Sequence, residues 1–237
     1  MRILVTRPEP DAERTAQALR ARGHDAVLAP VLRIETLDAD VGAPPWAAVL
    51  MTSANAARAV ATHSQRDEII RRPAFTVGDR SAEAARAAGF TEVTSAKGDA
   101  EALIALVASR LTPGTAPLLY LAGAERAADV AGALRAHGFT VHSAVAYRAA
   151  ALTALPSDAV AALGAGRIDA VLHFSARTVA VFLDLAQGVA LLDKSLNCQH
   201  YCLSSGGAAK LRAAGASRVA VAAQPDEAAL LDLVGRA

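Results

Sequence analysis

The sequence has few of the residues on which several classes of protein depend. Two of its 237 residues are cysteine, and only 4% are aromatic. Cys198 and Cys202 are spaced C-x3-C, and no second Cys/His pair completes a zinc site with them. We therefore expect ordinary reduced thiols, as is usual in the cytoplasm, and no metal centre.

An excess of charge of one sign is missing too. Lysine and arginine number 24 against 23 aspartates and glutamates, so the net charge is +1. Such a chain has no long-range field with which to hold nucleic acid or an anionic membrane. Any anionic ligand must be held by local groups.

Long hydrophobic runs are also absent. No run approaches the roughly 20 apolar residues that a membrane span needs. The sequence from Met1 to Pro8 enters a strand-like run directly and lacks the apolar stretch and cleavage site of a signal peptide. We expect a cytoplasmic protein with no membrane partner.

Apolar residues make up 53% of the chain, and many are alanine, a strong helix former. Strand-like runs alternate with segments of helical period, which indicates βαβ units and parallel sheets. The strand-like runs are Ile3–Thr6, Ala26–Ile34, Ala48–Thr52, Phe75–Val77, Leu118–Leu121, Val141–Tyr147, Ala170–Phe174, Tyr201–Ser204 and Arg218–Ala222.

The second half of the sequence repeats the pattern of the first. Residues 18–24 correspond to residues 133–139, each a helix end closing on glycine before a strand, and residues 52–60 correspond to residues 174–182. Two modules of about five strands each are therefore expected. The last helix of each half matches at an offset of 127: Asp99, Leu103 and Val107 correspond to Asp226, Leu230 and Val234.

Ligands of open parallel sheets bind beyond the carboxyl ends of the strands. Thr52, Ser53 and Asn55 lie at such a junction, and Ser175 lies at the equivalent junction of the second half. Their hydroxyl and amide groups, beside free backbone N–H groups at a helix start, could bind an anion. Plain N-capping is the alternative.

Two further junctions carry glycine and serine. Gly78 would let a ligand approach the backbone, and Ser81 follows it; the repeat places Ser204 in the equivalent segment, residues 203–207. Neither segment matches G-x-G-x-x-G or the Walker pattern, so nucleotide binding is not supported.

Single charged and aromatic residues leave more than one interpretation open. Arg7 could bind a ligand, cap a helix, or pair with Glu9 or Asp11. Tyr147 could donate a proton to a leaving group or cover a domain edge. The six histidines are dispersed without H-E-x-x-H spacing or a nucleophile elbow, which disfavours metal and triad hydrolysis. The choice between pairing and ligand binding also applies to Arg58, Arg80, Arg126 and Lys210.

Taken in order, these segments resemble the uroporphyrinogen-III synthase family over essentially the whole chain. The matching segments are residues 3–8 (ILVTRP), 30–34 (PVLRI), 51–56 (MTSANA), 77–81 (VGDRS), 120–123 (YLAG), 145–147 (VAY) and 174–175 (FS).

The resemblance implies two flavodoxin-like α/β domains with parallel sheets, residues 1–35 plus 150–237 and residues 36–149. They would be joined by a two-segment linker, with the active site in the interdomain cleft. The implied reaction converts the linear tetrapyrrole poly-carboxylate hydroxymethylbilane to uroporphyrinogen III, with loss of water and inversion of ring D. The implied enzyme is a monomer without a cofactor.

By position, the resemblance implies that Tyr147 is catalytic and assists loss of the hydroxyl group. Two departures from the family pattern affect the C-terminal wall: residues 204–207 replace a Gly-Pro-x-Thr-like turn, and His173 replaces Thr or Phe. The implied substrate-binding residues are Arg7, Thr52, Ser53, Asn55, Gly78, Ser81, Gly123, Ser175 and Ser204.

Two other functions compete with this one. Two α/β lobes also describe a non-catalytic binding or sensor protein for an anionic small molecule. A two-lobed glycosyltransferase usually needs a longer chain and a nucleotide-sugar site, which the sequence does not show.

Overall fold

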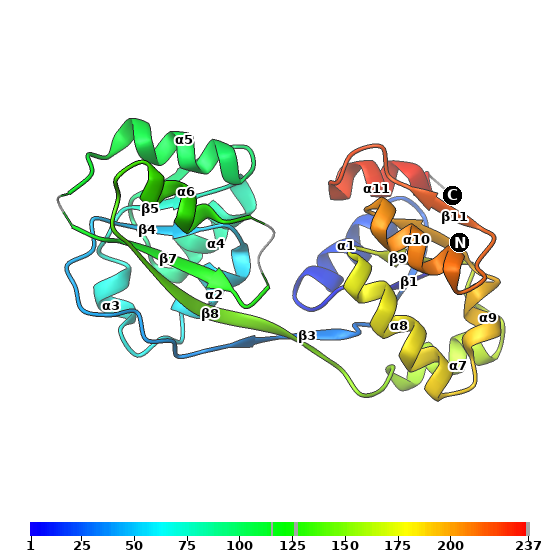
Figure 1. Cartoon of the computed structure of the whole chain (residues 1–237). Coiled ribbons are helices and arrows are strands. Elements are labelled where there is room, and N and C mark those ends of the chain that lie inside the picture. Colours follow the sequence, from blue (N-terminus) through cyan, green and yellow to red (C-terminus); the bar gives the residue numbers. More distant parts are fainter. Residues whose placement is uncertain (115, 126–127, 236–237) are drawn as a thin grey trace. The chain divides into compact units, whose positions relative to one another are not determined.

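The computed structural model describes residues 1–114, 116–125 and 128–235 (Figure 1). Its contacts divide the chain into two compact units. Unit 1 combines Met1–Arg33 with Ala150–Ala237, and unit 2 is Ile34–Ala149. The chain therefore passes between the units twice, at residues 33–34 and 149–150.

Unit 1 contains a five-stranded sheet in the order β11-β10-β9-β1-β2, and every pair of neighbours is parallel. In chain order this is 2-1-3-4-5, the order of flavodoxin. The strands are β1 (Arg2–Val5), β2 (Asp25–Leu28), β9 (Ala170–His173), β10 (Gln199–Cys202) and β11 (Val219–Val221).

A second sheet has six strands in the order β3-β8-β7-β4-β5-β6. The pairs from β8 to β6 are parallel. In contrast, β3 and β8 run in opposite directions, because Leu37 N donates to Ala146 O at one end of the pair and Leu152 N donates to Val31 O at the other. The strands are β3 (Leu32–Thr36), β4 (Ala48–Met51), β5 (Ala74–Thr76), β6 (Val93–Ser95), β7 (Leu118–Gly123) and β8 (Val141–Ala151).

Helices connect the strands. None of those in the described residues is both long and apolar enough to cross a membrane. The helices are α1 (Asp11–Arg20), α2 (Ala54–Val60), α3 (Arg66–Ile69), α4 (Asp79–Ala88), α5 (Ala100–Arg110), α6 (Val130–Ala136), α7 (Ser157–Gly164), α8 (Ala176–Gly188), α9 (Leu192–Leu196), α10 (Ser205–Ala213) and α11 (Glu227–Val234).

Alternating side chains of the strands in unit 2 build a core on each face of the sheet. Val49 and Met51 of β4 pack with alanines of α2 and α4, whereas Leu50 packs on the opposite face with Leu103 of α5 and Leu134 of α6. Because successive strand residues point to opposite faces, a strand covered by helices on both sides is apolar throughout. The predicted α/β class with parallel sheets is confirmed.

The repeat is visible in the helix starts and ends. Asp99 and Asp226 are the N-caps of α5 and α11, and each side-chain carboxylate accepts hydrogen bonds from backbone N–H groups of the first turn. Gly23 and Gly138 follow α1 and α6 with the same φ of +86°, a conformation that favours glycine. The matched apolar positions of α5 and α11, Leu103, Val107, Leu230 and Val234, are all buried.

Each sheet combines parts of both repeat copies. Unit 1 takes β1 and β2 from the first copy and β9, β10 and β11 from the second. The second sheet takes β4, β5 and β6 from the first copy and β7 and β8 from the second. The opening β-α-β segment of each copy therefore completes the sheet of the other.

Three strand predictions differ from the structure. The run Ala26–Ile34 is two strands in different sheets, β2 and β3, because the chain leaves the first sheet at Ala29 and Pro30. The three-residue strand β6 was not predicted. Finally, β8 continues to Ala151, so Tyr147 lies inside a strand rather than at its end.

Candidate active site

A cavity of about 320 Å³ lies in unit 2 at the carboxyl ends of β4, β5 and β7. Four residues predicted from the sequence line it: Thr52, Ser53, Gly123 and Tyr147. Its other described lining residues are Val77, Gly98, Asp99, Ala100, Tyr120, Glu125, Ala128 and Val130. The carboxyl-end rule pointed to Thr52 and Ser53, whereas Gly123 was implied by the family resemblance and Tyr147 was singled out as one of three tyrosines.

Tyr147 lies against the backbone of Gly123. The two residues are partners across the β7–β8 pair, next to an irregularity between Ala122 and Gly123. A Cβ atom at position 123 would lie 2.7 Å from Tyr147 Cζ and 2.8 Å from the phenol oxygen. Any side chain at position 123 would therefore displace the Tyr147 ring from this place.

Burial raises the pKa of the Tyr147 phenol above its usual value. A hydrogen bond with Ser53 acts in the opposite direction, while Tyr120 and Glu125 also raise the pKa. The phenol is therefore protonated at neutral pH, which suits it to donating a hydrogen bond or a proton.

Thr52, Ser53 and Asn55 have different local partners. Ser53 is the N-cap of α2, and its hydroxyl accepts a hydrogen bond from Asn55 N at 3.2 Å. The Asn55 side-chain oxygen accepts from Arg58 Nη1 at 2.7 Å. The Thr52 hydroxyl lies 3.3 Å from the Tyr120 phenol. Capping therefore accounts for part of the Ser53 contacts, but its side chain also reaches Tyr147.

Gly78 and Ser81 lie at the start of α4, in the same unit but outside the lining of this cavity. Gly78 is the N-cap residue, and a Cβ atom there would meet nothing within 4 Å. The Ser81 side chain is buried within the helix packing. The substrate-binding roles of both residues stay predictions.

Arg7, Ser175 and Ser204 belong to unit 1 and follow three neighbouring strands, β1, β9 and β10. Ser175 forms a capping box with Thr178, whose N–H donates to the serine hydroxyl at 3.1 Å. Ser204 is the N-cap of α10, but its side chain does not cap the helix.

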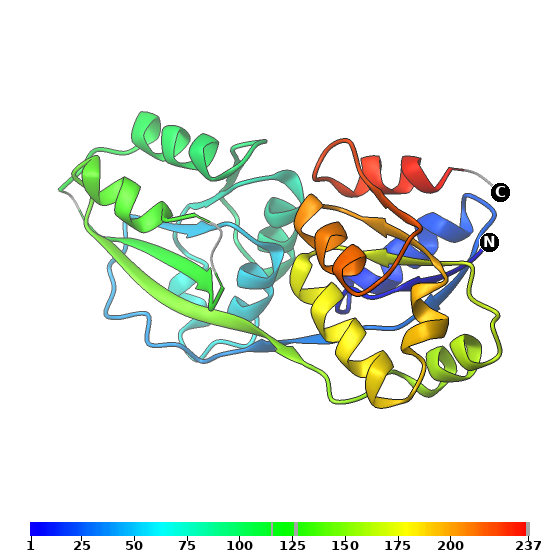
Figure 2. The same ribbon diagram turned by 45° about the vertical axis from the view of Figure 1, so that its right-hand side comes forward.

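The departure at residues 204–207 has a packing reason. Helices α8 and α10 lie side by side, as Figure 2 shows. A Cβ atom at Gly207 would be 3.3 Å from Val179 Cγ2 of α8. Small residues at the start of α10 therefore let the two helices approach closely.

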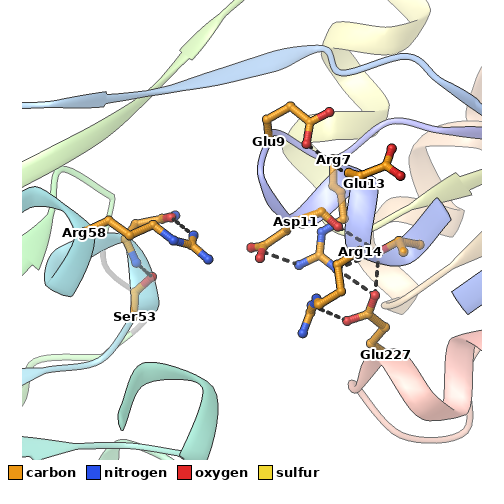
Figure 3. A network of polar contacts seen from close by, with 10 residues as sticks. Arg7, Glu9, Asp11, Glu13, Arg14, Ser53, Arg58 and Glu227 are labelled. Carbon is orange, nitrogen blue, oxygen red and sulfur yellow. Dashed lines mark hydrogen bonds and ion pairs between the residues drawn. The ribbon is translucent and has the colours of Figure 1, made fainter. Parts of the chain in front are cut away.

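Arg7 is held by several groups of unit 1 (Figure 3). Its guanidinium lies 3.4 Å from a carboxylate oxygen of Asp11 and 3.0 Å from one of Glu227, and it lies 4.2 Å from the centre of the Phe174 ring. The pairing with Asp11 was one of the expected alternatives, whereas Glu227 comes from the far end of the sequence. Arg14 also pairs with Glu227, so these contacts tie α1 to α11.

The structure does not decide between pairing and ligand binding for the remaining candidate cations, Arg58, Arg80, Arg126 and Lys210. Arg58 donates to Asn55, and Arg80 and Lys210 lie on exposed positions of α4 and α10. Arg126 lies outside the described residues. Within the described part of the chain, no three His, Cys, Asp or Glu side chains are grouped so that they could hold a metal ion.

The family model of uroporphyrinogen-III synthase HemD matches residues 13–232, which is most of the chain. The chain belongs to the uroporphyrinogen-III synthase family. Among curated proteins, no sequence matches it.

Solved structures with this family name match almost the whole chain. The uroporphyrinogen-III synthetase of Helicobacter pylori is 17% identical over 99% of this chain and 98% of that chain, with a TM-score of 0.65. A mutant uroporphyrinogen III synthase from Thermus thermophilus is 19% identical over 99% and 96%, with a TM-score of 0.47. At 17% identity, the similarity to the Helicobacter pylori structure supports the fold of this chain and nothing beyond it.

Sequence reasoning missed three polar residues that line the cavity of unit 2. Tyr120 lies inside β7 rather than in a loop after a strand, so a search of strand ends passes over it. Asp99 was interpreted only as part of a repeated helix, and Glu125 follows β7 in a segment that matched no motif. The scarcity of tyrosine, with three in the chain, was the signal that could have identified Tyr120.

Proposed function

We propose that this chain cyclises hydroxymethylbilane to uroporphyrinogen III, with loss of water and inversion of ring D. The observation that carries this assignment is the family match over residues 13–232. The cavity of unit 2 supports it, because hydroxyl groups and the protonated phenol of Tyr147 line it at the carboxyl edge of a parallel sheet.

Tyr147 is the proposed proton donor. As the bond between the hydroxymethyl carbon and its oxygen breaks, the phenol proton passes to the leaving oxygen, and water departs. The resulting cation bonds to the substituted α-carbon of ring D to give a spiro intermediate. The bond from that α-carbon to the neighbouring methylene then breaks, and the methylene bonds to the free α-carbon of ring D, which inverts the ring. The proton released from this last carbon restores the phenol. The reaction therefore consumes no acid and needs no oxidant.

Two carboxylates complement the charge that develops in this step. Asp99 and Glu125 are the charged side chains in the described lining of the cavity. A carbon that loses hydroxide becomes positively charged, and fixed negative groups near it lower the barrier. The same carboxylates disfavour binding of a substrate carboxylate directly beside them.

The substrate side chains would therefore bind at the hydroxyl groups. We propose that Thr52 and Ser53 hydrogen-bond one carboxylate of the substrate. Asn55, Gly78 and Ser81 are the other proposed substrate-binding residues of unit 2. A cavity of about 320 Å³ is near the lower limit of small-molecule sites and suits one substituted pyrrole ring. Arg7, Ser175 and Ser204, on unit 1, would bind other side chains of the four-ring substrate.

Holding a flexible molecule in one reactive conformation accounts for much of the catalysis in this proposal. We further propose that the enzyme acts in the cytoplasm and as a monomer. Buried thiols at Cys198 and Cys202 support a reducing compartment. Light scattering of the purified chain would test the monomeric state.

A turnover experiment separates the enzyme from a binding protein. Hydroxymethylbilane is generated in situ in about 100-fold excess over the purified chain. The product is oxidised and measured as uroporphyrin III. An enzyme forms many equivalents of the type III isomer per chain. At most one equivalent would identify a binding protein and contradict the proposal.

A further inference from the structure

Tyr120 forms a hydrogen-bonded pair with Thr52 that the register of the sheet fixes. Leu50 of β4 is directly opposite Tyr120 of β7. Thr52 lies two residues beyond Leu50, so its side chain is on the same face, diagonal to Tyr120. The hydroxyl oxygens are 3.3 Å apart, and both residues line the cavity of unit 2.

Either hydroxyl could donate at this distance, and the burial of the two residues favours one direction. Tyr120 is 2% exposed, whereas Thr52 is half-buried at the cavity wall. Within the described residues, neither hydroxyl has another hydrogen-bond partner. If Thr52 donated, the phenol proton would be buried without an acceptor, an unfavourable arrangement. Burial thus favours the phenol as the donor to Thr52 Oγ1, which leaves the threonine proton facing the cavity.

We propose that Tyr120 is a positioning residue that turns the Thr52 hydroxyl into a donor for a carboxylate of the substrate. This inference rests on the proposed function. The hydrogen bonds run in series from the phenol through the threonine hydroxyl to a carboxylate oxygen, and each bond polarises the next. Because Tyr120 lies in β7 and Thr52 directly follows β4, the donor is oriented before substrate binds.

A double-mutant cycle tests this role. Thr52→Val removes the donor, and a hydrogen bond to a charged group accounts for about a 30-fold loss of kcat/KM, mainly through KM. Tyr120→Phe leaves the Thr52 hydroxyl unoriented and should lower kcat/KM about fivefold. Because Tyr120 acts through Thr52, the double variant should be no worse than Thr52→Val alone.

Two variants serve as controls. Thr52→Ser keeps the hydroxyl and should restore most of the activity, which distinguishes a lost donor from a damaged fold. Tyr201→Phe, on β10 of unit 1, removes the third tyrosine hydroxyl and should leave kcat/KM unchanged. Thermal melting of each variant checks that it is folded.

The outcomes separate this inference from the proposed function. Wild-type protein that forms only the type I isomer overturns both. Wild-type protein that forms type III, with Tyr120→Phe at wild-type kcat/KM or with additive losses in the double variant, overturns only the role of Tyr120. A larger loss in Tyr120→Phe than in Thr52→Val would also overturn it, because the phenol would then contact the substrate itself.

Discussion

At the scale of single residues, the Tyr147 ring occupies the space that a side chain at position 123 would fill. Gly123→Ala would place a Cβ atom 2.7 Å from Tyr147 Cζ, so the ring must move. A displacement of about 1 Å at a catalytic group can cost roughly 100-fold in rate. We expect a loss of this order in type III formation, with the protein still folded.

Gly188→Ala is the matched control for this substitution. Gly188 ends α8 in unit 1, and a Cβ atom there would meet nothing within 4 Å. We expect wild-type activity for this variant and, because alanine favours helix, a slightly higher melting temperature. Full activity in Gly123→Ala would show that the position of the Tyr147 ring does not limit the reaction.

Removing the Tyr147 hydroxyl tests its role as proton donor. General acid catalysis contributes about 100-fold or more, so Tyr147→Phe should slow type III formation by about that factor. Ser53→Ala should slow it less, because Ser53 only helps to bind one carboxylate and contacts the phenol. Initial rates of type III formation at saturating substrate compare the two variants. A wild-type rate in Tyr147→Phe would exclude the phenol as donor.

The raised pKa of Tyr147 predicts the basic limb of the pH profile. The phenol is the active form when protonated, and its pKa in the folded protein lies above the ordinary value of 10.0. We expect kcat to be independent of this group through neutral pH and to fall only at pH values above 10. A basic limb near pH 8 that disappears in Tyr147→Phe would contradict the raised pKa.

The part of the cavity formed by strand ends could be predicted from the sequence. Thr52 and Ser53 follow a strand whose end is readable from its apolar run, whereas Gly123 was implied only by the family resemblance. The contact between Gly123 and the Tyr147 ring depends on the register of β7 with β8, which no local pattern specifies. Tyr120 was missed for the same reason, since its partner Thr52 follows another strand, β4.

At the scale of elements, β9 and β10 are joined by a buried pair of histidines. His173 Nε2 and His200 Nδ1 are 3.1 Å apart, and His200 Nε2 is 3.1 Å from Ser195 O. A carbonyl can only accept, so His200 carries its proton on Nε2 and accepts from His173 on Nδ1. His173 Nδ1 is then a buried acceptor without a partner among the described residues.

This pair predicts that unit 1 loses stability in acid. Burial lowers the pKa of His200 to about 4 and that of His173 well below its usual 6.5. The unfolded chain therefore binds protons that the folded chain does not. The stability is complete above about pH 6.5 and falls as the pH drops toward 4, by about 2 kcal/mol at pH 5 from His200 alone.

Hydrogen exchange measures this effect strand by strand. Between about pH 7.5 and pH 5, we expect the protection factors of β9 and β10 to fall more than those of β4 and β7, which serve as the internal control. Equal losses in all four strands, or unchanged protection in β9 and β10, would show that the histidine pair does not set the acid stability of unit 1.

The predictability of the elements followed the strength of their local signals. The last helix of each half was predicted from its repeated apolar positions, whereas the N-cap roles of Asp99 and Asp226 came from the structure. The strand β6 covers three residues, too few for a pattern to develop. The division of residues 26–34 between two sheets depends on pairing with strands that come later in the sequence. The apolar run alone therefore could not predict it.

At the scale of the whole molecule, the exchange of β-α-β segments makes one unit continuous and the other discontinuous. Unit 2 is the single stretch Ile34–Ala149, whereas unit 1 needs both ends of the chain. We expect a fragment of residues 34–149 to unfold cooperatively in urea. A fragment of residues 1–33, with only β1, α1 and β2, should stay unfolded. A disordered 34–149 fragment would contradict the independence of unit 2.

The central claim is that this chain directs hydroxymethylbilane to the type III isomer. The most direct measurement supplies the full chain with hydroxymethylbilane generated in situ and resolves the uroporphyrin isomers after oxidation. We predict mainly type III, formed at an initial rate proportional to protein concentration. Type I alone, formed at the rate seen without the protein, would contradict the account.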